Sequence, residues 1–96
     1  MTQRFSTIQE LSEQESQLEL HIDTIEEKLS FLYPQRDIAL DYVNSLRGAS
    51  PSVLRQKAAI DRKILALQTK LQLLRSELRT VRGRLDRAGL EGLVLA

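Results

Sequence analysis

The side chains able to perform acid–base or metal chemistry are few in this sequence. It has one histidine, His21, and no cysteine, which excludes thiolate chemistry, disulfides and cysteine metal sites. A lone histidine on a charged helix edge is ordinarily a solvated side chain. Glu26 and Glu27 lack the Glu-x-x-His partner that a carboxylate-bridged metal site on helices requires. With no nucleophile–base pair or phosphate-binding glycine loop either, the sequence predicts a non-enzymatic protein without a cofactor, metal or small-molecule substrate.

Positive charge gathers in the second half of the chain and could bind phosphate. Arg75, Arg79 and Arg82 lie about one helical turn apart, the spacing that presents cations on one face of a helix to nucleic acid. No aromatic residue follows Tyr42, so this half has no ring on which to stack a base. Nucleic-acid binding is therefore kept as an alternative to protein–protein interaction.

The net charge of +1 conceals opposite charges in the two halves. Residues 1–46 contain nine acidic and three basic residues, a balance of −6, whereas residues 47–96 contain four acidic and eleven basic residues, a balance of +7. Two helices that lie side by side gain from opposite charge, while two copies of one helix repel. In antiparallel register, Glu19 and Glu26 would flank Arg75 and Arg82, so the charges favour pairing of the two halves with each other.

The elements that would position these residues follow from two heptad repeats. Such a 3.5-residue apolar period keeps one face of a helix against another helix. When the chain is folded at Gly48, the two repeats coincide, which predicts an all-α fold: a long antiparallel two-helix coiled-coil hairpin. The first repeat runs through Ile8, Leu11, Glu15, Leu18, Ile22, Ile25, Leu29, Leu32, Arg36, Ala39, Val43 and Leu46, and the second through Val53, Lys57, Ile60, Ile64, Leu67, Leu71, Leu74, Leu78, Val81, Leu85 and Ala88. We call these positions the seam.

Local residue types set the expected boundaries of the helices. Gly48 suits a left-handed C′ position, Ser50 can cap the next helix, and Pro51 fits its first position. We therefore expect one domain over residues 1–96, with helices at about 4–46 and 51–88 and a turn at 47–50. Gly89 and Gly92 are expected to end the second helix and leave a short apolar tail, residues 89–96.

Pro34 and three polar seam residues interrupt the pattern. Because the heptads pass through Pro34 without a change of frame, a kinked continuous helix is favoured over two helices that meet there. Glu15, Arg36 and Lys57 interrupt the apolar seam, and such residues commonly fix the register of paired helices. The alternative is that Arg36 and Lys57 mark a place where the hairpin loosens for a partner.

Apolar residues outside the seam point to a protein partner. A lone pair of helices would leave them exposed, and two helices alone seldom form a stable globule. A homodimer that forms a four-helix bundle would cover them, and so would a different protein. The partner-binding candidates are Phe31, Ile38 and Tyr42 in the first helix and Ala58, Leu65 and Leu73 in the second.

The central glycine also suggests a family resemblance. A hairpin of this length resembles the small secreted helical-hairpin proteins with a Trp-x-Gly turn, which implies secretion as a further alternative. The triplet here is Leu46, Arg47 and Gly48, without the tryptophan, and no Tyr-x-x-x-Asp/Glu signal follows the second helix. The residues from Met1 to Ser12 lack the order of a signal peptide, and no apolar run approaches the ~20 residues of a membrane span. We therefore expect a cytoplasmic protein–protein interaction module, such as an adaptor, a chaperone or a structural subunit of a larger assembly.

Overall fold

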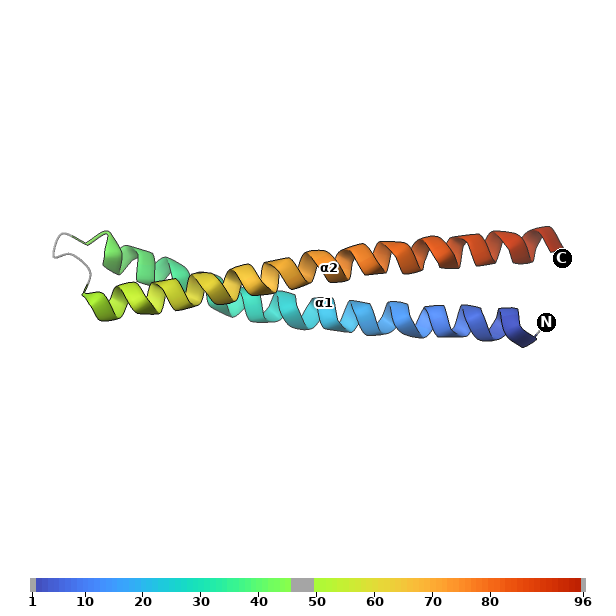
Figure 1. The fold of residues 1–96 in the computed structure, drawn as a ribbon, viewed down its shortest axis with the longest axis horizontal. Coiled ribbons are helices and arrows are strands. Elements are labelled where there is room, and N and C mark those ends of the chain that lie inside the picture. Colours follow the sequence, from blue (N-terminus) through green and yellow to red (C-terminus); the bar gives the residue numbers. More distant parts are fainter. Residues whose placement is uncertain (1, 46–49, 96) are drawn as a thin grey trace. The chain divides into compact units, whose positions relative to one another are not determined.

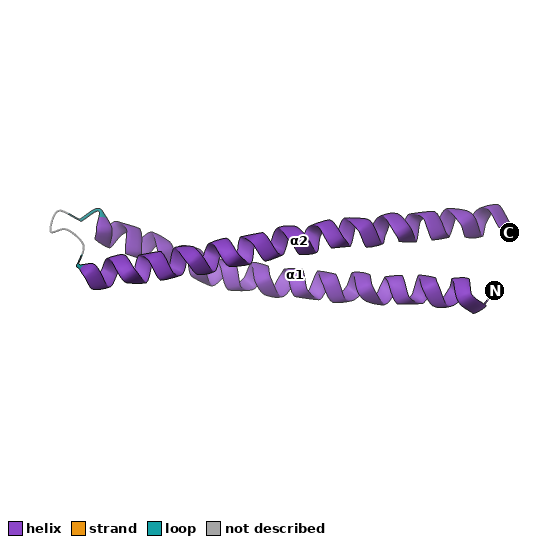
Figure 2. Cartoon of the chain, viewed as in Figure 1, coloured by secondary structure: helices purple, strands orange, loops and turns teal. Residues whose placement is uncertain are grey.

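The computed structural model is an all-α helical hairpin of two long helices (Figures 1 and 2). It describes the backbone of residues 2–45 and 50–95 and the side chains of residues 7–45 and 50–89. Helix α1 spans Thr2–Val43 and helix α2 spans Pro51–Leu95. No strand occurs in these backbone ranges.

The two helices contact each other in two separate units. The terminal unit combines Met1–Asp23 of α1 with Gln72–Ala96 of α2, and the turn unit comprises Thr24–Leu71. In each unit a segment of α1 runs antiparallel beside a segment of α2, as Figure 1 shows for the blue and red ends of the chain in the terminal unit. Each unit therefore has its own helix–helix contact.

The buried residues follow the predicted seam. No polar side chain in the described part is buried, so the helices are held together mainly by aliphatic side chains. Every described residue that is buried occupies a seam position, which confirms the antiparallel packing inferred from the heptads. These residues are Leu11, Ile22, Ile25, Leu29, Ala39, Ile64, Leu71, Leu78 and Val81.

The start of α2 confirms the expected cap. The Ser50 hydroxyl accepts a hydrogen bond from the Val53 amide at 3.2 Å, and the helix begins at Pro51. This bond satisfies one of the amide groups that the first turn of a helix leaves without a partner. The expected role of Gly48 concerns residues 46–49, which lie outside the described residues.

The ends of both helices differ from the expected positions. Helix α1 ends at Val43 rather than near residue 46, and the Ser45 amide bonds the Tyr42 carbonyl at 3.2 Å in a tighter turn. Helix α2 continues to Leu95 instead of ending at residue 88. Gly89 lies within the helix and does not adopt the left-handed conformation that ends helices, and a helical glycine costs only about 1 kcal/mol. That cost is too small to stop the helix.

Helix α1 is a single helix that contains Pro34. The break into two helices, considered as the alternative from the sequence, does not occur. Because α1 continues through the proline, the seam keeps one register on both sides of it, from Leu29 to Ala39, both of which are buried.

Candidate functional site

An arginine of α2 joins two glutamates of α1 in the terminal unit. The Arg82 Nη2 lies 2.8 Å from the Glu19 Oε1, and its Nε lies 3.2 Å from the Glu15 Oε2. Hydrogen bonds to Glu19 and then to Glu15 raise the pKa of the Arg82 guanidinium above its ordinary value. This geometry explains the polar seam residue Glu15, whose carboxylate turns outward to an arginine of the other helix.

The same ion pairs bear on the predicted nucleic-acid site. Of its three residues, Arg82 is held by two carboxylates, and Arg75 takes part in a further interaction within the chain. Arg79 is exposed on the same helix. A phosphate group would have to compete with carboxylates for Arg82, so the local electrostatics favour matching of the helices over phosphate binding. Nucleic-acid binding itself stays a prediction.

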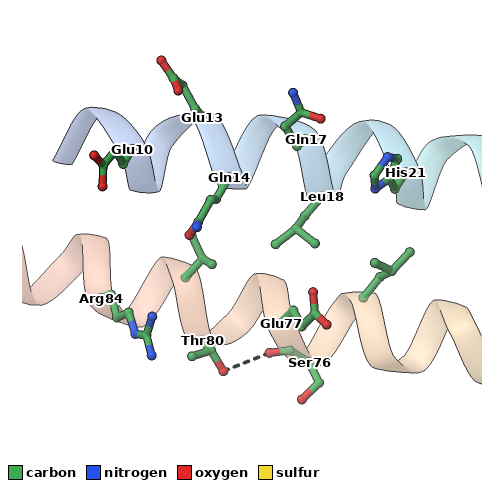
Figure 3. A pocket seen from close by; sticks show the side chains of 12 residues that line it. Glu10, Glu13, Gln14, Gln17, Leu18, His21, Ser76, Glu77, Thr80 and Arg84 are labelled. Carbon is green, nitrogen blue, oxygen red and sulfur yellow. Dashed lines mark hydrogen bonds between the residues drawn. The ribbon is translucent and has the colours of Figure 1, made fainter. Parts of the chain in front are cut away.

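A groove of about 770 Å³, lined mostly by polar and charged residues together with Leu18, Leu74 and Val81, runs beside the seam of the terminal unit (Figure 3). His21 of α1 and Glu77 of α2 both line it. In Figure 3 Leu18 points toward α2, whereas Glu13 points away from it. Among the side chains that the structure describes, no group of three or more His, Cys, Asp or Glu residues is arranged to hold a metal ion.

The turn unit exposes large apolar side chains instead. The exposed fractions are 64% for Phe31, 58% for Ile38, 62% for Tyr42 and 64% for Leu65. Ala58 is exposed as well. The remaining candidate, Leu73, belongs to the terminal unit and is 62% exposed. All six predicted partner-binding residues are thus at the surface, where another protein could reach them.

The structure separates these candidates into distinct places. Phe31 lines an apolar groove of about 460 Å³, which we call the Phe31 groove. Ile38 and Tyr42 line a second hollow of about 340 Å³ together with Asp41 and Ser45. Neither hollow includes Ala58 or Leu65. The lining residues of the Phe31 groove are Lys28, Phe31, Leu32, Lys63, Ala66 and Leu67.

Sequence reasoning did not identify the Phe31 groove or the two lysines that line it. The heptads contain the information that places this groove. Phe31 and Ala66 occupy c positions of the two helices, and Lys28 and Lys63 occupy g positions. In an antiparallel pair, the g positions of both helices lie on one side of the seam. The pattern of either helix alone does not show that these four residues meet.

Polar contacts surround the seam of the turn unit. Lys57 Nζ lies 2.7 Å from Asp61 Oδ2, one turn away on α2. The sequence did not identify the hydrogen bond that Gln68 Nε2 donates to the Tyr33 hydroxyl at 3.0 Å. The Arg36 guanidinium also lies 5.2 Å from the centre of the Tyr33 ring, within the range of a cation–π contact. These contacts give Lys57 and Arg36 partners inside the hairpin.

Comparison with known proteins gives no family assignment, because no protein-family model, curated protein or solved structure matches this chain. In the described part of the chain, neither helix has an apolar stretch of the length that a bilayer crossing requires. Inference about function therefore depends on the surfaces of the two units.

Proposed function

We propose that this hairpin is a non-enzymatic coiled-coil module that binds or bridges other proteins in the cytoplasm, as an adaptor, a chaperone or a structural subunit of a larger assembly. The observation that supports this proposal is the set of exposed apolar side chains in the turn unit. Phe31, Ile38, Tyr42 and Leu65 each expose more than half of their surface. Such residues, when grouped, are typical of protein-binding surfaces.

The total surface of the chain supports the same proposal. The accessible surface is 7682 Å² for a chain of 11.0 kDa. A compact monomer of this mass exposes about 5,600 Å². The difference, about 2,000 Å², is of the size that one chain buries in a large permanent interface. A partner could therefore cover much surface without any change in the hairpin itself.

A second copy of the chain fits best at the surface around Leu65, which we call the Leu65 surface and define by Ala58 and Leu65. The residues one turn from Leu65 include Arg62 and, on the negative side, Asp61, which also bonds Lys57 of its own helix, so this surface carries both signs of charge. In a twofold symmetric contact, a surface with both signs can meet its own opposite charges. We therefore propose that two hairpins pack here into a four-helix bundle.

Light scattering at several protein concentrations tests the proposed function. We expect wild-type protein to have twice the 11.0 kDa mass of the chain, and Leu65→Glu to remain helical but become monomeric. A carboxylate buried in an apolar contact loses its hydration without gaining a partner, whereas on a free surface it costs little. Leu20→Glu is the matched control, because Leu20 is 62% exposed in the terminal unit.

Two results would contradict these proposals. A wild-type protein that stays monomeric at every concentration would show that the Leu65 surface does not bind a second copy. If Leu65→Glu and Ile38→Glu both leave mass and partner binding unchanged, the exposed apolar residues are ordinary surface, and the interaction role is wrong.

A further inference from the structure

We propose that the Phe31 groove binds an acidic amphipathic helix of another protein. This inference rests on the proposed interaction role and adds the chemical class of the partner. Its basis is the combination, in one groove, of apolar side chains from both helices with two lysines that have no acidic partner in the described part of the chain.

The shape of the groove suits a third helix. Leu32 and Phe31 of α1 line it together with Ala66 and Leu67 of α2, so its walls come from two antiparallel helices. A small residue such as Ala66 opposite a large one such as Phe31 lets the backbone of an incoming helix approach α2 closely. Amphipathic helices bind by placing apolar side chains into grooves of this kind, whereas a flat bilayer surface does not fill a groove.

The charge of the groove selects an acidic partner. The residues one turn from Lys28 are Thr24, Ile25, Phe31 and Leu32, none of them acidic. The residues one turn from Lys63 are all apolar, namely Ala59, Ile60, Ala66 and Leu67. Both lysines are exposed and line the same groove, and neither has an acidic residue one turn away on its own helix. Glutamates or aspartates that flank the apolar face of a bound helix would neutralise both lysines.

A second copy of this chain fits the groove poorly for the same reason. In a twofold symmetric contact, each copy would bring its own Lys28 and Lys63 to one patch, which gathers four positive charges. The Leu65 surface has no such conflict, because Asp61 and Arg62 lie beside it. The two surfaces therefore differ in the occupant that their charges favour.

The partner helix can extend along α1 beyond the groove. Ile38 and Tyr42 follow Phe31 by seven and eleven residues, which is heptad spacing, and both are exposed. Asp41 lines the hollow beside them. The acidic residues of the partner are therefore expected opposite Lys28 and Lys63, and not opposite Asp41.

A designed peptide tests the inference on the full chain. The probe is a four-heptad peptide with leucine at a and d and glutamate at e and g, which repels itself at neutral pH. The control has lysine at e and g. We expect the glutamate peptide to gain helicity with the protein, measured by circular dichroism, and to bind at least about tenfold more tightly than the lysine peptide by calorimetry.

Variants locate the binding site. Joint replacement by Lys28→Gln and Lys63→Gln should weaken binding of the glutamate peptide about tenfold, and Phe31→Ala about thirtyfold. The matched control is Arg79→Gln with Arg87→Gln. It removes the same charge from two exposed side chains of the terminal unit, which belong to neither the Phe31 groove nor the Leu65 surface. Exchange of both lysines for glutamate should reverse the preference to the lysine peptide.

Each contrary outcome has a distinct meaning. Equal binding of both peptides, or equal loss in the arginine control, would overturn the acidic-helix inference and leave the interaction role intact. The inference would also fail if vesicles of phosphatidylserine and phosphatidylcholine bind the protein through Lys28 and Lys63 while the glutamate peptide does not. It would fail as well if the wild type is a dimer and Phe31→Ala makes it monomeric. Failure of the proposed function is separate, since it requires that Leu65→Glu and Ile38→Glu change nothing.

Discussion

The two units of this hairpin join the same two helices by different chemistry. In the terminal unit Arg82 of α2 links Glu15 and Glu19 of α1, and a groove lined mostly by polar and charged residues runs beside the seam. In the turn unit a neutral hydrogen bond joins Tyr33 to Gln68, and an apolar groove with two lysines runs beside the seam. In the terminal unit the charges of Glu15, Glu19 and Arg82 are used within the chain. Those of Lys28 and Lys63 in the turn unit remain available to a partner.

This difference indicates a division of roles. Aliphatic seam residues pack in both units, with Leu78 and Val81 buried in the terminal unit and Leu29 and Ile64 buried in the turn unit. Both units expose large apolar side chains, but the grooves beside the seam differ, because apolar residues and two lysines line the Phe31 groove whereas mostly polar and charged residues line the groove of the terminal unit. Stability is therefore expected to depend on the seam in both units, and binding on the turn unit alone.

The largest effect is expected from removal of a seam side chain. Ile64 is 3% exposed and the next residue, Leu65, is 64% exposed. Ile64→Ala should lower the free energy of unfolding by roughly 2–5 kcal/mol, because it leaves a cavity in the helix contact. Leu65→Ala should change it by less than about 0.5 kcal/mol in dilute protein. Chemical denaturation measures both, and equal effects would contradict the assigned register.

A smaller, stabilising effect is expected at Pro34. The proline nitrogen cannot donate the hydrogen bond that a helix makes to the carbonyl of Ser30, yet α1 continues through it. Pro34→Ala should therefore raise the free energy of unfolding by roughly 1–3 kcal/mol. Gly83→Ala gives the comparison in the terminal unit, with a gain of up to about 1 kcal/mol, because an added Cβ meets no atom within 4 Å. Destabilisation by Pro34→Ala would show that the proline is required for the observed path of α1.

The ion pairs of Arg82 should have a still smaller effect, and one that depends on salt. Arg82→Gln is expected to lower Tm by less than Ile64→Ala does, because exposed ion pairs are screened and their side chains lose entropy. The loss should shrink at about 1 M salt, where the Debye length is about 3 Å. Arg79→Gln, in an exposed arginine of the same helix, serves as the control. A decrease in Tm that is independent of salt would indicate that Arg82 acts through packing rather than charge.

The heptads allowed the seam to be predicted from sequence, whereas the ends of the helices were misplaced. The seam was predictable because a 3.5-residue period recurs over many turns, so one substitution such as Glu15 does not erase it. The end of α2 depends on Gly89 and a few weak local preferences, which differ by about 1 kcal/mol or less. Such small differences do not fix a boundary.

The candidate site was predictable only in part, for a related reason. Exposure of Phe31, Ile38 and Leu65 followed from their positions outside the seam. Prediction of the Phe31 groove requires knowing which residues of α2 line it together with Phe31, among them Lys63 and Ala66. That knowledge comes from the packing of two segments far apart in the chain, not from the pattern of either segment.

The smallest expected effect concerns nucleic acid. Joint replacement of Arg75, Arg79 and Arg82 by glutamine should leave no measurable change in binding to a DNA duplex at low salt, because wild-type protein is expected not to bind it. Fluorescence anisotropy with a labelled duplex measures this. A salt-dependent affinity of the wild type that the triple variant lacks would instead support phosphate binding by α2.

The division of roles between the units is tested most directly by a single tryptophan, since the chain has none. Phe31→Trp, Leu65→Trp and Leu20→Trp each place one fluorophore at a site that is 62–64% exposed. We predict a blue-shifted emission for Leu65→Trp as protein concentration rises, a blue shift for Phe31→Trp when the glutamate peptide is added, and no shift for Leu20→Trp under either condition. Emission that stays unshifted at both turn-unit positions, or that shifts equally at Leu20, would contradict the assignment of the turn unit as the binding surface.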